Sequence, residues 1–309
     1  MTTQRRTVSA VIVFSRGWLL PSMAMPRSVW APAIGLAYIT TIATLGRLHG
    51  GNILLGSLAL LDVYNVRSRQ FLRTFLPCII TGALYDSFRF FLHPVISGHI
   101  HVVGPYVVDR AWFGVDGGTL NEVFLHHHWA IVDLVAGFAY LVYVAEYLVL
   151  AMVLFFRGVH VRAHTFARGF LVVNLMGFIT YLVYPAAPPW YVTAHGFGSA
   201  QVDVPPSPGG GQRFDELLGT HIFKNVYGHS VEVFGALPSL HVAYPMLAML
   251  LVLRTSALQW ARGPVIVYAL IMCFSAVYLQ HHYVIDVLLG AVYAVLAAAI
   301  VLRWERRRP

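Results

Sequence analysis

The sequence predicts an all-α, polytopic membrane protein with a six-helix core and a possible extra N-terminal helical hairpin. Of its 309 residues, 58% are hydrophobic and only 11% are charged, whereas soluble domains carry about a quarter charged residues. Several apolar runs have the length of about 20 residues that a helix needs to cross a bilayer. The formal net charge of +8 comes from arginines that flank these runs without forming a continuous basic stripe, so we expect no nucleic-acid partner.

The helices are expected in a simple order along the chain. Near the N-terminus, a short apolar run at 8–14 has no persuasive cleavage site and is interpreted as uncleaved. Two modest runs follow at 29–46 and 51–65, and this hairpin either spans the membrane or lies partly in the interface. Long polar segments at 93–128 and 185–237 separate some of the six longer runs. These six runs lie at 71–92, 129–156, 164–184, 238–254, 263–281 and 283–303.

Three parts of the chain follow from this order: an N-terminal segment at 1–66, a six-helix membrane domain at 67–303 that carries the candidate site, and a basic tail at 304–309. The arginines also predict which side of the membrane each loop faces, because cytoplasmic loops are enriched in Lys and Arg. The tail is arginine-rich, which predicts a cytoplasmic C-terminus. Both long polar segments then face the extracytoplasmic side, periplasmic or lumenal. The arginines expected inside are Arg67, Arg69, Arg73, Arg157, Arg162, Arg168, Arg254 and Arg262.

Two histidine motifs stand at the expected outer mouths of membrane helices. In the segment Tyr278-Leu-Gln-His-His-Tyr-Val-Ile-Asp286, four residues separate His282 from Asp286. Both side chains would share one face of a helix, and a carboxylate there can fix the tautomer of the imidazole. A second motif, Leu237-Pro-Ser-Leu-His241, begins another apolar run, with Ser239 as the expected N-cap.

This pattern suggests chemistry on phosphate. Helix N-termini favour anions, and two imidazoles can divide the work of attack and proton transfer. His282 is expected to attack phosphorus because it has the orienting carboxylate, and His241 then protonates the departing oxygen. His281 is five residues from Asp286 and is expected to point elsewhere. His-x-x-x-Asp alone also occurs by chance, and a histidine beside an aromatic ring at a membrane interface is common, so the argument depends on both motifs together.

These residues resemble the type-2 phosphatidic acid phosphatase superfamily, and within it the inositol phosphorylceramide synthase branch. A third match is Tyr184-Pro-Ala-Ala-Pro-Pro-Trp190. The resemblance covers about residues 70–303. It implies a six-helix membrane core, a phosphohistidine at His282 assisted by Asp286, a leaving-group role for His241, and no metal or other cofactor. The general phosphatase pattern differs: it has glycine where Leu240 stands and a Ser-Arg pair at the positions of Ser275 and Ala276.

Because that arginine is missing, the positive partners of the phosphate must come from elsewhere. Arg89 ranks first, since an arginine near the end of an apolar helix needs a partner, although an ion pair with Asp86 or snorkelling would also explain it. Arg110, Arg213 and Lys224, the only lysine, are the other outward candidates. The expected substrate-binding residues are Arg89, Asp86, Lys224, Arg213, Ser239, Tyr184 and Trp190.

Other polar residues have simpler interpretations. Three adjacent histidines, 126–128, diverge by about 100° on a helix and make a poor metal chelate. Asp133 either lines the substrate cavity or lies at a solvated helix mouth, and Glu146 is expected to bond a neighbouring helix. Cys78 and Cys273 both lie in apolar runs and indicate no disulfide or zinc site.

Three functions remain open on the sequence. The first is a lipid phosphotransferase that moves a phosphorylated headgroup, which the resemblance suggests is phosphoinositol, from a phospholipid donor to a lipid alcohol such as ceramide. The second is a phosphatase for a lipid phosphate or a polyprenyl diphosphate, with water as the acceptor. The third is a transporter or structural membrane protein with incidental histidines. The oligomeric state is not predicted.

Overall fold

The computed structural model describes residues 30–46, 48, 50–228 and 232–307, and its regular structure is helical. The short N-terminal apolar run at 8–14 lies outside this part of the chain. Two compact units divide between Arg73 and Thr74, inside one helix, whereas the sequence analysis placed the boundary at 66/67. The helices are α1 (Trp30–Thr44), α2 (Gly50–Ser57), α3 (Leu61–Tyr64), α4 (Val66–Ile96), α5 (Val103–Phe113), α6 (Leu120–His126), α7 (Ala130–Phe156), α8 (His160–Val183), α9 (Pro189–His195), α10 (Gln212–Leu218), α11 (Ile222–Gly228), α12 (Leu240–Leu253), α13 (Arg262–Tyr278) and α14 (Val284–Arg306).

The first unit contains a helical hairpin at the predicted place. Its helices α1 and α2 cross where Gly35 meets Gly56, and a Cβ at either glycine would collide with the other helix. Asn52 on α2 donates a hydrogen bond to the hydroxyl of Tyr38 on α1, 3.0 Å away. Both helices are apolar but shorter than a full span.

In the second unit, all six predicted apolar runs form helices. Among the described residues, α4, α8, α14 and the segment Ser256–Tyr278, which contains α13, are long and apolar enough to cross a membrane. The two halves of α7 meet at 51° and together make a fifth candidate span. The remaining helix, α12, has 14 residues. It packs against α7, α8, α13 and α14, so it is the central helix of this unit and buries most of its side chains.

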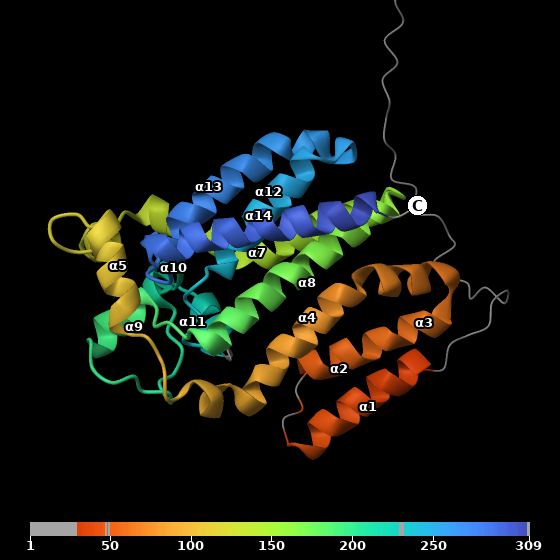
Figure 1. Ribbon diagram of the computed structural model, residues 1–309, viewed down its shortest axis with the longest axis horizontal. Helices are drawn as coiled ribbons and strands as arrows, with labels where there is room; N and C mark the ends of the chain where they lie inside the picture. The colour runs from red at the N-terminus through yellow and green to blue at the C-terminus, as the bar shows by residue number, and fades with distance from the viewer. Residues whose placement is uncertain (1–29, 47, 49, 229–231, 308–309) are drawn as a thin grey trace, which may run out of the picture. The chain divides into compact units, whose positions relative to one another are not determined.

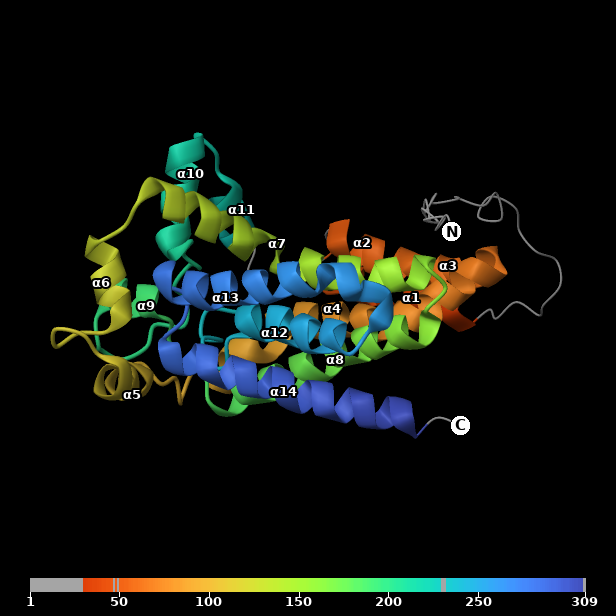
Figure 2. The ribbon, with the colours of Figure 1, turned by 90° about the horizontal axis from the view of Figure 1, so that it is seen from above.

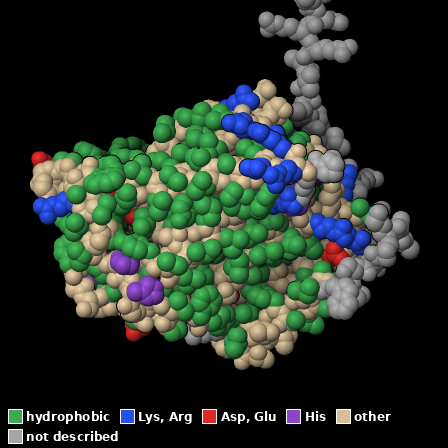
Figure 3. All heavy atoms as spheres, in the orientation of Figure 1, with side chains coloured by type: hydrophobic (Ala, Val, Ile, Leu, Met, Phe, Trp, Pro, Cys, Tyr) green, Lys and Arg blue, Asp and Glu red, His purple; other side chains and the backbone are tan. Residues whose placement is uncertain are grey.

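The polar segments gather at one end of these helices. Figures 1 and 2 place α5, α9, α10 and α11 at the end of the bundle where α14 starts, away from its arginine-containing last turn, and Figure 2 labels α6 at the same end. Hydrophobic side chains cover the flanks of the long helices, and the Lys and Arg side chains visible on this face cluster mainly towards the end where α14 finishes (Figure 3). This distribution matches a polar cap at one end of an apolar belt.

The two long polar segments are joined by short backbone bridges. Ala186, in the proline-rich motif after α8, pairs with His101 on one side and Gly235 on the other. The amide of Ala236 donates to the carbonyl of Ala186, and the amide of Ala186 donates to that of Phe234, at 3.3 and 2.7 Å. The proline-rich motif therefore anchors the loop that leads into α12.

Candidate active site

The turn between α13 and α14, residues 279–283, carries His282. Helix α14 begins at Val284 with Tyr283 as its N-cap, so His282 precedes the helix instead of occupying its first turn as predicted. The reason is local: the carboxylate of Asp286, at the third helical position, folds back to accept the amide N–H of Tyr283 at 2.8 Å. Asp286 thus caps its own helix as well as facing His282.

The ring of His282 is held in one tautomer. Its Nδ1 lies 2.8 Å from the carbonyl oxygen of Ala236, which can only accept, so Nδ1 carries the proton and Nε2 of the neutral ring has the free lone pair. The nearest carboxylate oxygen of Asp286 lies 3.8 Å from the same Nδ1. Asp286 is fully buried. The carbonyl therefore orients the ring, and Asp286 supplies the negative charge next to it.

His241 meets His282 directly. It lies in the first turn of α12, whose N-cap is Ser239 as predicted, with the Ser239 hydroxyl accepting the amide of Val242. Nδ1 of His241 is 3.1 Å from Nε2 of His282. Because that Nε2 is the acceptor, His241 donates. The ring of His241 also stacks on Tyr140, with ring centroids 4.2 Å apart. The structure therefore brings together the two histidines that the motifs singled out.

His281 lies in the same cavity, although its spacing predicted a different direction. Its ring is sandwiched between Tyr140 and Tyr227, with centroids 4.9 and 4.5 Å away. Its Nε2 donates to the carbonyl of Pro208 at 3.1 Å. Burial lowers the pKa of His281 to about 3, with a further contribution from His282. It is a neutral, packed ring and contributes to the wall of the cavity.

The histidines line a cavity of about 590 Å³, within the range typical of small-molecule sites. Trp190, Ala236, Tyr181 and Glu232 also line it, and the substrate-binding role of Trp190 stays a prediction. Burial raises the pKa of Glu232 to about 8. Among the described residues, no lysine or arginine lines the cavity.

The predicted cationic partners lie elsewhere in the described structure. Arg213 binds Asp133 at 2.6 Å and covers the ring of Tyr278, and Arg89 pairs with Asp86 at 3.0 Å. Lys224 is exposed, and so is Arg110. Tyr184 stacks on His101 at 3.8 Å and lies outside the cavity lining. The assignment of these side chains to substrate binding remains a prediction.

The polar segments hold the α13–α14 turn from several sides. From α6, Asn121 donates to the carbonyls of Val277 and His282 at 2.9 and 3.0 Å. From α5, fully buried Asp109 accepts the amide of Ile285 at 3.0 Å. The side chain of Gln280 donates to the carbonyl of Asn121 at 2.7 Å, although its backbone has a left-handed φ of 66°. Sequence reasoning missed Asp109, which belongs to no motif, and gave no role to Gln280, although it lies inside the segment Tyr278–Asp286.

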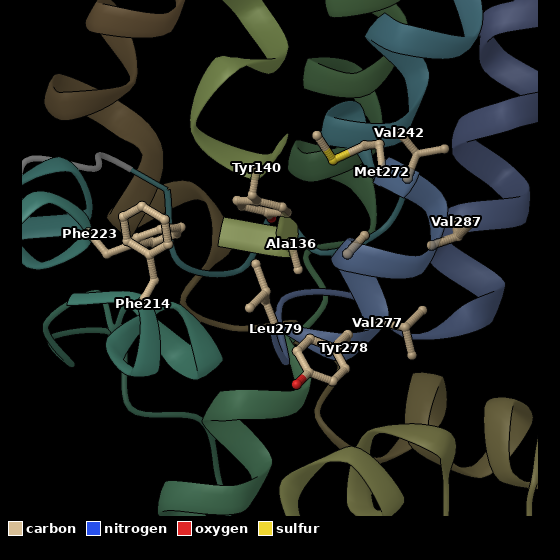
Figure 4. Packing of buried hydrophobic residues seen from close by; sticks show 11 residues of the cluster. Ala136, Tyr140, Phe214, Phe223, Val242, Met272, Val277, Tyr278, Leu279 and Val287 are labelled. Carbon is tan, nitrogen blue, oxygen red and sulfur yellow. The ribbon is translucent and has the colours of Figure 1, made fainter. Parts of the chain in front are cut away.

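A hydrophobic cluster lies beneath this turn. Figure 4 shows Tyr140 between the rings of Phe214 and Phe223 on one side and Val242 with Met272 on the other. The cluster includes residues of α7, α10, α11, α12, α13 and α14. The ring that stacks on both His241 and His281 is therefore fixed by packing on either side.

Two further polar groups differ from simple expectation. His128 approaches Asp133 at 3.4 Å, and no cluster of three potential metal ligands occurs in the described part of the chain. Both carboxylate oxygens of Glu146 on α7 are buried without a hydrogen-bond partner among the described residues. The predicted bond from Glu146 to a neighbouring helix is therefore wrong for this structure.

Comparison with known proteins gives a consistent result. A phosphoinositol dihydroceramide synthase of Bacteroides thetaiotaomicron is 35% identical over 271 residues, which cover 85% of this chain and 87% of that protein. Two fungal proteins named inositol phosphorylceramide synthase catalytic subunit, from Schizosaccharomyces pombe and Saccharomyces cerevisiae, are 30% and 33% identical. Those matches cover 61% and 57% of this chain but only 48% and 44% of the fungal proteins.

No solved structure matches the chain significantly. The sequence model of the PAP2 superfamily, in contrast, matches residues 106–300. That range contains His241, His282 and Asp286 and extends from α5 into α14. The chain is therefore a multi-pass membrane enzyme that belongs to the PAP2 superfamily.

Proposed function

We propose that the protein is a lipid phosphotransferase that moves phosphoinositol from phosphatidylinositol to a lipid alcohol of the ceramide or dihydroceramide type. The observation that carries the proposal is the contact between His241 Nδ1 and His282 Nε2 inside a cavity large enough for a ligand. The relatives supply the substrate class, since their names specify phosphoinositol or inositol phosphate transfer to ceramides.

The first step is attack on the donor phosphodiester. Nε2 of His282 forms a bond to phosphorus, and the bond from phosphorus to the diacylglycerol oxygen breaks. His241, as an imidazolium, gives the departing oxygen its Nδ1 proton, and the bound anion favours that charged form. The Nδ1–H already points at Nε2 of His282, so a modest displacement of His241 directs it at an oxygen on phosphorus.

The second step reverses these roles. The phosphorylated ring of His282 keeps its proton on Nδ1 and carries positive charge, which the Asp286 carboxylate, 3.8 Å away, stabilises. The hydroxyl of the acceptor lipid then attacks phosphorus, the N–P bond breaks, and the hydroxyl proton passes to neutral His241. Donor and acceptor therefore share one site in turn, and His282 returns to its starting state.

The proposal places this site on the extracytoplasmic side of the membrane and the C-terminus in the cytoplasm. The support is the arginine distribution: the last turn of α14 contains Arg303 and Arg306, whereas His282 precedes its first turn. The proposed partners are a phospholipid donor, a lipid alcohol acceptor and the bilayer.

Purified protein incubated with inositol-labelled phosphatidylinositol, with and without dihydroceramide, tests the function. An acceptor-dependent labelled lipid is expected, together with an acid-labile phosphoenzyme that forms without acceptor. His282→Ala should abolish both signals. Asp286→Asn should slow turnover by about 10²- to 10⁴-fold by leaving a positive ring uncompensated. Release of water-soluble inositol phosphate, independent of acceptor, would identify a hydrolase instead.

A further inference from the structure

The cavity extends well beyond the histidines. Besides the outer loops, it is lined by one face of α4, at Cys78, Gly82 and Tyr85, and by the inner faces of α7 and α8. From Tyr140, which stacks on His241, the lining continues along α7 to Leu148, eight positions further. At about 1.5 Å of rise per residue this is at most about 12 Å, because α7 bends by 51° within this stretch, compared with a hydrocarbon core about 30 Å thick.

This inner part of the cavity presents an apolar surface. Leu141, Val144 and Leu148 line it from α7, and Phe170 and Phe178 line it from α8. Three of its polar side chains bond within the protein. Asn174 binds the hydroxyl of Tyr244 at 2.6 Å and the carbonyl of Phe170 at 2.7 Å, and Thr81 donates to the carbonyl of Pro77 at 2.9 Å. A hydrocarbon chain satisfies such a surface, whereas a sugar or a second phosphate does not.

A packed layer adjoins this lining: Tyr147 precedes Leu148 on α7, and Phe166 lies one turn from Phe170 on α8. Tyr147 and Phe166 are fully buried, and the Tyr147 hydroxyl donates to the carbonyl of Phe166 at 2.8 Å. Leu247 of α12, also fully buried, approaches the same place near Gly169, where an added Cβ would lie 2.9 Å from the Tyr147 hydroxyl and 3.3 Å from Leu247. Close packing of this kind leaves no room for a chain to continue.

We propose that this inner part of the cavity binds one hydrocarbon chain of a lipid substrate, with the headgroup at His282, and that the layer of Tyr147, Phe166 and Leu247 limits the length of that chain. The inference rests on the proposed phosphotransferase function. The two lipid substrates are both possible sources of the chain, and the experiment separates them. Leu148 is the last α7 residue of the lining, so a substitution there should change which chain length the enzyme prefers.

The test uses Leu148→Trp, which shortens the space, and Val149→Trp as the matched control, because Val149 lies next to it on α7 and is 49% exposed. Transfer is measured with short-chain and long-chain donors at fixed acceptor, and then with short-chain and long-chain acceptors at fixed donor. In Leu148→Trp, the long-to-short ratio of kcat/KM should fall about tenfold for one of the two lipids. In Val149→Trp, the ratio should stay as in the wild type.

Leu148→Ala covers the case in which tryptophan disrupts folding, because the enlarged space should shift the preference towards longer chains. Unchanged ratios for both lipids in Leu148→Trp and Leu148→Ala would overturn the inference. Failure of the underlying function looks different, since the wild type would then transfer no headgroup. Native mass spectrometry of His282→Ala gives a readout without turnover: the long-chain lipid should be retained, and adding Leu148→Trp should release it.

Discussion

At the scale of single residues, the candidate site depends on backbone groups as much as on the side chains of its motifs. The carbonyl of Ala236 decides which nitrogen of His282 is free, and the carbonyl of Pro208 takes the N–H of His281. Neither acceptor can be replaced by changing its own side chain. Sequence reasoning could find His241, His282 and Asp286 because each belongs to a short motif, but a carbonyl 46 positions away from His282 leaves no pattern.

Gln280 offers a test of backbone strain next to His282. Its φ of 66° lies in the region that costs a non-glycine residue about 1 kcal/mol. Gln280→Ala should lower the thermal stability in detergent, because it keeps the strain and loses the bond to the Asn121 carbonyl. Gln280→Gly loses the same bond but relieves the strain, so it should be more stable than Gln280→Ala by about 1 kcal/mol. Equal stability of the two variants would show that the turn is unstrained.

Asn121 gives a second test at this scale. Its amide group donates to the carbonyls of Val277 and His282. The Val277 carbonyl keeps the amide of Gln280 at 3.1 Å, so Asn121→Leu deprives mainly the buried His282 carbonyl of its donor, at a cost of about 1–3 kcal/mol. The Asn121→Leu substitution should also slow phosphoenzyme formation, because the turn that carries His282 is less firmly held. Stopped-flow quench with labelled donor measures this rate. A rate equal to that of the wild type would assign Asn121 to folding alone.

At the scale of elements, α5 fixes the start of α14. Val103 and Val107, one turn apart on α5, form an apolar, exposed face, as expected for a helix that lies in a membrane interface. Its opposite face buries Asp109, which accepts the amide of Ile285. The α5 backbone therefore positions the helix that follows His282. Sequence analysis treated 93–128 as a long polar segment, because an 11-residue helix has only about three turns and gives a weak periodic signal.

Asp109 predicts a specific pH dependence of stability. Burial raises its pKa to about 6, and Asp286 adds to the shift, whereas the amide of Ile285 opposes it. Because the folded state prefers the protonated form, the contribution of Asp109 is fully present below about pH 4 and is lost as the pH rises through 6. Asp109→Asn keeps an oxygen acceptor without the charge. As the pH rises from 4 to 7, the melting temperature of Asp109→Asn should therefore increase relative to that of the wild type.

The control for this prediction is Asp109→Leu, which cannot accept the amide and should be less stable than Asp109→Asn at every pH. A constant difference in melting temperature between the wild type and Asp109→Asn from pH 4 to 7 would contradict the assignment. The neighbours that must stay unchanged are Tyr106, Glu122, Tyr283 and Asp286, which act electrostatically on the same group or on each other.

At the scale of the whole molecule, local patterns predicted the helices, the cap and the paired histidines. Apolar runs and N-cap residues are short-range signals. The partners of the arginines cannot be predicted from short-range signals. Arg213 pairs with Asp133 from a different helix, 80 positions away. For this reason the sequence analysis counted Arg213 as available to bind phosphate. The short length of α12 was also missed, because its burial by four neighbouring helices depends on the assembled bundle.

The charge of the cavity predicts substrate selectivity. Its described lining contains three histidines and Glu232 but no lysine or arginine, so a phosphodiester with one negative charge should bind better than a monoester, which carries about −1.5 to −2 at neutral pH. Competition between phosphatidylinositol and phosphatidic acid measures this preference. The diester should win by at least about tenfold, which corresponds to about 1.4 kcal/mol. Equal use of the two lipids would require a cation near the site.

The bond between His241 and His282 has a consequence for chemical reactivity at rest. The lone pair on His282 Nε2, which should attack phosphorus, accepts the hydrogen bond from His241 at 3.1 Å. The proton donor therefore also shields the nucleophile before a substrate binds. Uncharged electrophiles, such as imidazole-acylating reagents, carry no negative charge that could attract the N–H of His241 away from His282. An anionic ester carries one, so its binding should free the lone pair of His282 Nε2 for reaction.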